Sequence, residues 1–402
     1  MYCLDIKQEY GYNILVLFLY NLYPQKLNFK RILIMRKFFE PLKMADKGIL
    51  TIICILGFIS LLILESTVYE NGFVLDRAVV VQALAYFIGF IALCFILHLD
   101  YSLFQMFTKP LYILSLLFLL TVYIPGLGVE LYGARSWIDL GPTTLQPSEF
   151  VKIPFILLMA NYLTTHREDI KKFRGVVLAG LYAVPIILIV LKEDLGSALV
   201  YMSIWLFMVF FAGIDYKILI KSIIGVACAI PIAYNFLDDY QKDRIEAFLH
   251  PDNLTLPGNY QVWQSKVAMG SGGFFGKGLF NGTQKEMDFI PVQESDFIFA
   301  VIVEELGFIG GLFVIFLYGG LLYRMVLGIR DAIDWYGALI ITGFTAMFIF
   351  QVFENIAMTM GIMPVTGITL PLLSGGGTSV IATLMGLGVV LNVGINSKSI
   401  RF

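Results

Sequence analysis

Ten apolar segments run along the 402-residue chain, and polar stretches separate them. Each segment is close to the roughly 20 mostly apolar residues with which an α-helix crosses a bilayer. Because the apolar residues are continuous and do not alternate with polar ones, we predict spanning helices and not barrel strands. The pattern therefore predicts an all-α integral membrane protein. The predicted spans are residues 48–66, 79–97, 110–125, 149–165, 174–191, 195–213, 217–236, 297–323, 336–355 and 376–395.

The longest polar stretch, residues 238–295, separates the seventh predicted span from the eighth. Lysine and arginine concentrate in the N-terminal segment and in alternate loops, for example at Arg167, Lys171, Arg324 and Arg330. Basic loops stay on the cytoplasmic side of a membrane. We therefore expect both termini in the cytoplasm and residues 238–295 as a large extracytoplasmic loop.

The sequence predicts one membrane domain. We expect a cytoplasmic N-terminal segment at 1–47, the membrane domain at 48–396 and a short cytoplasmic tail at 397–402. Residues 1–34 precede Met35 and could come from an upstream start codon. The composition is 58% hydrophobic and 14% charged, whereas soluble domains carry about 25% charged residues. The net charge of −2 argues against a nucleic-acid partner.

The fourth predicted span opens with Glu149 and Lys152, two charged residues on nearly the same helix face. They could form a simple stabilising ion pair. Since a lysine that faces hydrocarbon is costly, Lys152 should point into the bundle or a hydrated cavity, where it could hold an anionic headgroup. Arg135 and Trp137 lie just upstream in an outside loop, where Trp137 could also belong to an interfacial aromatic belt.

Asp194 stands between two apolar spans with almost no loop, directly after Lys192 and Glu193. The dipole of the following helix favours a carboxylate at this place. These charges could form a solvated hairpin. Alternatively, Asp194 could bind a cation or a sugar hydroxyl at the outer interface.

Asp296 lies at the start of the eighth predicted span. A helix N-terminus commonly carries such an aspartate for its dipole alone. Glu304 and Glu305 follow about 12 to 14 Å deeper, at roughly 1.5 Å per residue. They project from other sides of the helix than Asp296, so we assign them a structural or cavity-lining role, because carboxylates at that depth need partners.

The segment 364–379 contains two prolines and the glycine triplet that follows Ser374. This composition predicts a re-entrant or tightly turned segment before the last span. Non-helical backbone at membrane depth is tolerated only where it is buried in protein or lines a cavity.

From about Gly48 to Asn396 the chain resembles the SEDS family (shape, elongation, division and sporulation), ten-span membrane proteins of bacterial cell-wall synthesis. Within the family it is similar to the elongation branch, typified by RodA, since Thr366 stands where the division branch usually has a lysine. Two departures from the family pattern are Glu294-Ser295 in place of His-Thr, and Gly375 in place of a tyrosine. The motifs that carry the resemblance are Gly-Ala-Arg-Ser-Trp at 133–137, Gln-Pro-Ser-Glu-Phe-Val-Lys at 146–152, Asp-Leu-Gly-Ser-Ala at 194–198, Gln-Ser-Lys-Val-Ala-Met-Gly-Ser-Gly-Gly at 264–273, Asp-Phe-Ile-Phe-Ala at 296–300 and Leu-Pro-Leu-Leu-Ser-Gly-Gly-Gly-Thr-Ser at 370–379.

The resemblance implies a peptidoglycan glycosyltransferase that polymerises lipid II at the outer face of the bacterial cytoplasmic membrane, during elongation and rod-shape maintenance. It implies Asp296 as the general base for the acceptor hydroxyl, a role that contributes roughly 10² to 10⁴ in rate. The charge of the diphosphate leaving group calls for cationic side chains or a divalent cation such as Mg²⁺ or Mn²⁺. Arg135, Lys152 and Lys266 are the outside candidates for this role.

Four further residues complete the substrate-binding candidates: Trp137, Glu149, Asp194 and Ser374. The partners that the resemblance implies are a class B penicillin-binding protein, which is a transpeptidase, and other membrane proteins of the elongation complex, within membrane lipid. The alternatives are a lipid II flippase and a scaffold that only recruits a transpeptidase. A transporter is expected to have inverted repeats and matched broken helices, which the sequence does not display, so the polymerase is favoured.

Overall fold

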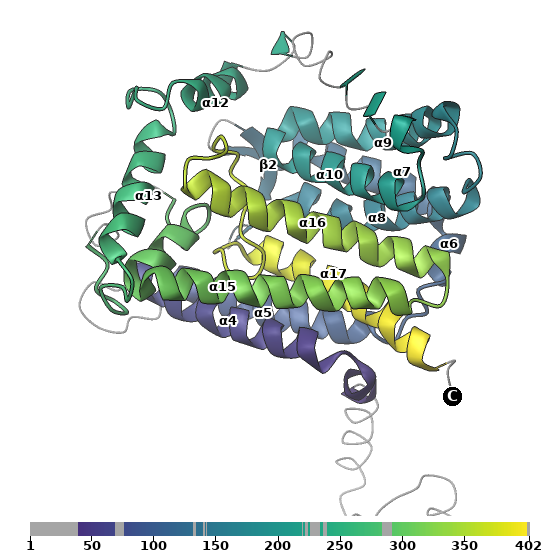
Figure 1. Cartoon of the computed structure of the whole chain (residues 1–402), viewed down its shortest axis with the longest axis horizontal. Coiled ribbons are helices and arrows are strands. Elements are labelled where there is room, and N and C mark those ends of the chain that lie inside the picture. Colours follow the sequence, from purple (N-terminus) through teal and green to yellow (C-terminus); the bar gives the residue numbers. More distant parts are fainter. Residues whose placement is uncertain are drawn as a thin grey trace, which may run out of the picture. The chain divides into compact units, whose positions relative to one another are not determined.

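The computed structural model describes residues 39–68, 76–131, 134–139, 141, 143–218, 220–221, 224–225, 234–235, 239–283 and 292–399 (Figure 1). Residues 1–34 and most of the predicted seventh span lie outside these residues. The chain divides into two units, residues 1–44 and residues 45–402. The helices of the second unit are α4 (Lys47–Val68), α5 (Arg77–Ile96), α6 (Leu103–Met106), α7 (Thr108–Leu120), α8 (Pro147–Thr165), α9 (Phe173–Glu193), α10 (Leu195–Phe211), α12 (Asp239–Leu249), α13 (Asn259–Gly272), α15 (Ile298–Asp331), α16 (Trp335–Thr359) and α17 (Gly377–Ser399), with a short 3₁₀ helix at Thr121–Tyr123.

Every predicted span except the seventh overlaps one of these helices, so the predicted helical membrane fold is confirmed. Among the described helices, α4, α5, α9, α15, α16 and α17 are long and apolar enough to cross a bilayer, and α7 and α10 are shorter apolar helices. The chain is a multi-pass membrane protein. Helix α17 continues to Ser399, into the stretch expected to be a tail.

The core of the bundle lies along α16, most of whose residues are buried. Helix α16 packs against α8, α10, α15 and α17, and α17 packs against α5. Phe344 of α16 and Leu387 of α17 are fully buried, whereas Phe87, Leu188 and Phe316 on outer helices are exposed. Large apolar surface of this extent on outer helices is expected where lipid tails replace water.

A small antiparallel sheet, in the order β1-β2-β3, precedes α8. Its strands are β1 (Gly128–Leu131), β2 (Ala134–Asp139) and β3 (Thr144–Leu145). Val129 pairs with Trp137, and Asp139 pairs with Thr144. The sequence predicted only a loop at Arg135 and Trp137. The sheet fixes the conformation of this segment.

The segment between α16 and α17 is a largely buried, non-helical loop, as predicted from residue 364 onward, but residues 377–379 of the predicted segment already belong to α17. The Asn355 side-chain amide donates to the Ile368 carbonyl at 2.8 Å, and the Tyr318 hydroxyl donates to the Pro371 carbonyl at 2.5 Å. The Gln82 side-chain amide donates to the Ser374 carbonyl at 3.0 Å. Side chains of three helices, α5, α15 and α16, therefore satisfy backbone groups that water cannot reach.

Helix α15 is interrupted at Gly307, whose φ of 73° and ψ of −173° are not helical. A loop that follows α13 takes up the freed backbone groups. The Phe308 N–H donates to the Gly273 carbonyl at 2.9 Å, and the Lys277 N–H donates to the Glu304 carbonyl at 3.0 Å. A side chain at residue 307 would collide with the backbone of this loop, since a Cβ there would lie 2.3 Å from the Gly276 nitrogen. This break could not be predicted from the sequence.

Candidate functional site

Asp296 lies in the turn that leads into α15, and its side chain is half-buried. The Ser295 hydroxyl donates to Asp296 Oδ1 at 2.9 Å. The Asn355 side-chain amide donates to the Asp296 backbone carbonyl at 2.9 Å, so α16 fixes the turn. Both partners hold the carboxylate in place at the end of the bundle where α15 begins.

Two charged residues from other elements surround the carboxylate, Arg244 on α12 and Asp194 at the start of α10. A Cβ at Gly367 would lie 3.6 Å from Asp296 Oδ2 and 3.8 Å from Arg244 Nη1, so both groups border the same glycine. Burial raises the pKa of Asp296, and the negative charge of Asp194 adds to this effect. The Ser295 hydrogen bond and the Arg244 guanidinium lower the pKa of Asp296, because both stabilise the carboxylate.

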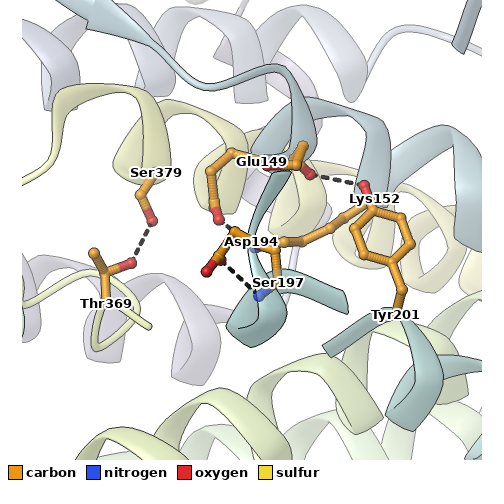
Figure 2. A network of polar contacts seen from close by, with 8 residues as sticks. Glu149, Lys152, Asp194, Ser197, Tyr201, Thr369 and Ser379 are labelled. Carbon is orange, nitrogen blue, oxygen red and sulfur yellow. Dashed lines mark hydrogen bonds and ion pairs between the residues drawn. The ribbon is translucent and has the colours of Figure 1, made fainter. Parts of the chain in front are cut away.

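Asp194 is the N-cap of α10, as the sequence indicated (Figure 2). Its carboxylate accepts hydrogen bonds from the backbone N–H of Gly196 at 3.2 Å and of Ser197 at 2.8 Å. The start of α10 abuts the buried loop, because a Cβ at Gly196 would lie 2.7 Å from the Thr366 carbonyl oxygen. Helix capping therefore accounts for part of the role of Asp194, and its charge also reaches Asp296.

Glu149 and Lys152 form a buried ion pair on the first two turns of α8 (Figure 2). Lys152 is 2% exposed, so it points into the bundle, as predicted. The Tyr201 hydroxyl donates to the Ser148 carbonyl at 2.7 Å and joins α10 to the same turn. Lys152 is already neutralised by Glu149, which makes it a weaker anion ligand than an unpaired lysine.

The candidates from the predicted outside loop, Arg135 and Trp137, lie on the small sheet. Arg135 is exposed on β2, and Trp137 on the same strand is half-buried. Between them, the Ser136 hydroxyl donates to the Glu193 carbonyl at 2.8 Å, so the sheet is attached to the end of α9. Glu193 itself is 1% exposed, although the sequence suggested a solvated hairpin there.

Lys266 and Ser374 have different surroundings. Lys266 is exposed on α13, and its Nζ lies beside Gly361, at the end of α16, where its charge complements the helix dipole. The Ser374 hydroxyl accepts from the Leu370 N–H at 2.8 Å and donates to the Ser295 carbonyl at 2.5 Å. Ser374 therefore joins the buried loop to the turn that carries Asp296.

Glu304 and Glu305 are both fully buried and have partners, in keeping with a structural role. Lys277 Nζ lies 2.6 Å from Glu304 Oε1, and the Ser66 hydroxyl donates to Glu305 Oε1 at 2.5 Å. These contacts tie the interrupted turn of α15 to the loop after α13 and to α4.

No metal cage is formed by the part of the chain that the structure describes, since no three His, Cys, Asp or Glu side chains gather there. Asp194 and Asp296 are near each other, but Arg244 borders the same place. These residues do not fit a resident divalent cation.

Two contributors to the site, Arg244 and Asn355, were missing from the sequence candidates. Arg244 is one of the few basic residues expected on the outside, which is the signal that could have singled it out. Asn355 is a polar residue inside an apolar span. The arrangement places a carboxylate beside a guanidinium and a hydroxyl, so it can accept a proton from an alcohol and hold an anion at the same place.

Comparisons with known proteins add the following similarities. The model of the FtsW, RodA and SpoVE cell cycle proteins matches residues 45–399. The chain is 38% identical to stage V sporulation protein E of Bacillus subtilis, over 77% of this chain and 85% of that protein. It is 35% identical to the peptidoglycan glycosyltransferase MrdB of Escherichia coli, over 71% and 78%. A solved structure of a peptidoglycan synthase complex, described as coordinating polymerization and crosslinking, aligns with a TM-score of 0.75 at 30% identity, over 88% of this chain and 98% of that one.

Proposed function

The chain belongs to the FtsW/RodA/SpoVE family of cell cycle proteins, the SEDS family, and we propose that it polymerises lipid II into glycan strands with Asp296 as the base. It is a peptidoglycan glycosyltransferase, the name that its relatives carry. The observation that supports the proposed base is the position of Asp296 beside Arg244, Ser295 and Asn355.

The reaction joins an acceptor sugar hydroxyl to the anomeric carbon of a donor sugar that carries a lipid diphosphate. The hydroxyl oxygen forms the new glycosidic bond, and its proton passes to the Asp296 carboxylate. The bond from the anomeric carbon to the diphosphate oxygen breaks, and the diphosphate leaves with the electron pair. Asp296 must be ionised at the start of this step, and Arg244 supports that ionisation.

Arg244 is the cation that we assign to the diphosphate, in addition to the three cations considered from the sequence. Its guanidinium borders the same glycine as Asp296 and can donate to two phosphate oxygens at once. Arg135 and Trp137 are exposed on the sheet and would contact sugar or headgroup farther out. Lys152 is paired with Glu149, and Lys266 lies beside the end of α16. Both would therefore act mainly on these neighbours and less on the diphosphate.

A divalent cation, if one participates, would enter with the diphosphate of the substrate. Two phosphates bind Mg²⁺ or Mn²⁺ without a protein cage, and the described residues supply none. Removal of divalent cations by a chelator would then slow turnover without lowering the unfolding temperature of the protein. If a structural ion were resident in the protein, its removal would lower both the turnover rate and the unfolding temperature.

A penicillin-binding protein is the partner that the similarity to a peptidoglycan synthase complex supports. That it belongs to class B is part of our proposal. We also propose the bacterial cytoplasmic membrane as the location, with both termini inside, so that Asp296 meets its precursor at the outer face.

The elongation role is a further part of the proposal, because identities of 38% and 35% to a sporulation protein and to MrdB do not separate the branches. Thr366 in place of a lysine favours elongation. Depletion in a rod-shaped host should give round cells. Filaments or a defect confined to spores would assign another branch.

The flippase alternative is not favoured by the comparisons. Helix α15 is broken at Gly307, but no second described helix has a matching internal break with non-helical dihedrals. An assay in detergent micelles separates the two functions, because micelles have no leaflet to which a headgroup could be moved. The purified chain with its partner should convert lipid II into glycan strands, resolved by length on a gel. If no glycan strands form in micelles and the lipid II headgroup crosses the membrane in vesicles, the proposal of a polymerase is wrong.

A further inference from the structure

A crevice of about 290 Å³ lies between the ends of α4, α15, α16 and α17, far from Asp296. Arg324 at its edge lies about 39 Å beyond Ile298 along α15, at roughly 1.5 Å per residue. A bilayer measures about 40 to 45 Å with its headgroups. If Asp296 is at one interface, the crevice opens among the headgroups of the opposite leaflet.

The walls of the crevice are apolar. Ile49 of α4, Met325 of α15, Ile341 of α16 and Val390 of α17 line it. Gly394 of α17 widens it, because a Cβ at this position would meet no atom within 4 Å. Such a space suits a hydrocarbon chain better than water, which needs polar partners.

The rim of the crevice carries both signs of charge. Arg324 Nη1 lies 3.3 Å from Asp46 Oδ2, and the two side chains remain 45% and 30% exposed. Asp331 lines the same crevice two helical turns after Arg324. A guanidinium has five N–H donors, so the contact with Asp46 leaves Arg324 able to bind a phosphate as well.

We propose that this crevice binds an aminophospholipid of the phosphatidylethanolamine class. The phosphate contacts Arg324, the ammonium donates to the carboxylates of Asp46 and Asp331, and one acyl chain enters between α15 and α17. Exposed basic residues at the same helix ends, Lys47 and Arg330, attract the phosphates of anionic lipids in general. The two carboxylates therefore set the selectivity, because a glycerol headgroup has no cation for them and a choline has no N–H to donate.

The test measures lipid retention, not turnover, so it is independent of the glycosyltransferase proposal. The full-length protein is purified in detergent and stripped of lipid. It is then offered equal amounts of phosphatidylethanolamine, phosphatidylglycerol and phosphatidylcholine with the same acyl chains. Native mass spectrometry counts the bound lipids, and the unfolding temperature is measured in parallel.

We expect phosphatidylethanolamine to be retained at least ten-fold more than the other two lipids and to raise the unfolding temperature. Gly394→Leu should abolish this preference by filling the crevice. Gly319→Leu is the matched control, since Gly319 is also open on a spanning helix but does not line the crevice. Arg324→Gln, which leaves the apolar walls intact, should lower retention about ten-fold.

Equal retention of the three lipids overturns the proposal, as does an undiminished preference in Gly394→Leu or an undiminished retention of phosphatidylethanolamine in Arg324→Gln. Loss of the preference in Gly319→Leu also contradicts it, because the effect would then not belong to this crevice.

Discussion

Replacement of Lys277 by methionine tests whether the ion pair with Glu304 holds α15 to the loop after α13. Lys277 Nζ lies 2.6 Å from Glu304 Oε1, and the Glu304 side chain is fully buried. Methionine keeps most of the apolar stem and removes the ammonium. Lys277→Met therefore leaves the negative charge of Glu304 inside the protein without its cation.

The expected loss of stability follows from the burial of the two partners. Breaking a buried ion pair by removing one partner costs about 3 to 5 kcal/mol. The Lys277 side chain is 23% exposed, so water screens the pair in part, and we expect the lower end of that range. A loss of about 3 kcal/mol lowers the folding equilibrium constant by roughly 150-fold, since 1.4 kcal/mol corresponds to a factor of ten.

Equilibrium unfolding in mixed micelles, with a double-mutant cycle, measures this loss. Adding Glu304→Gln to Lys277→Met should recover more than half of the free energy of unfolding that Lys277→Met loses, because the amide needs no cation. Lys171→Met is the matched control. Lys171 forms a three-residue-spaced pair with Glu168 on the surface, with exposures of 55% and 80%, and such pairs contribute about 0.2 to 1 kcal/mol. Equal losses of stability for the two lysine substitutions, or strict additivity in the cycle, would show that the Lys277–Glu304 pair does not hold α15 in this way.

Three further outcomes follow from the site. Arg244→Gln should move the acidic limb of the pH–rate profile to higher pH, because the reaction needs the ionised carboxylate and Arg244 lowers the pKa of Asp296. An unmoved limb would show that Arg244 does not affect the ionisation of Asp296. Asn355→Leu removes hydrogen bonds to the carbonyls of Asp296 and Ile368, and each buried carbonyl left unsatisfied costs about 1 to 3 kcal/mol. Both the polymerisation rate and the unfolding midpoint should therefore fall. An unchanged rate would show that Asn355 does not position Asp296. Glu193→Gln should leave the protein as stable or raise its stability by about 1 kcal/mol, since neither carboxylate oxygen accepts a hydrogen bond from the described residues; a clear loss in denaturant unfolding would reveal an essential charge.

The spanning helices could be predicted from the sequence because bilayer thickness dictates a long apolar run. Local spacing also sufficed for the Glu149–Lys152 pair and for Asp194 at the start of α10, since both depend on positions within one helical turn. The buried loop after α16 was predictable because its glycines and prolines cannot continue a helix.

The partner of Asp296 could not be predicted in the same way. Arg244 reaches Asp296 through the packing of α12 near the buried loop, and no periodic pattern relates the two positions. The break in α15 could not be predicted either. Glycine is common in membrane helices, and the hydrogen bonds that mark the break join Phe308 and Glu304 to a distant loop. The short strands around Arg135 also lack the length that reveals an alternating pattern.

We propose that the carboxylate of Asp296 takes the proton from the acceptor hydroxyl. The most direct test is the single-turnover rate of glycosidic bond formation by Asp296→Asn, with lipid II in excess of its binding constant. If Asp296 is the base, this rate falls by roughly 10² to 10⁴, while lipid II binding and the unfolding temperature stay close to those of the parent protein. Bond formation at the parental rate would contradict it.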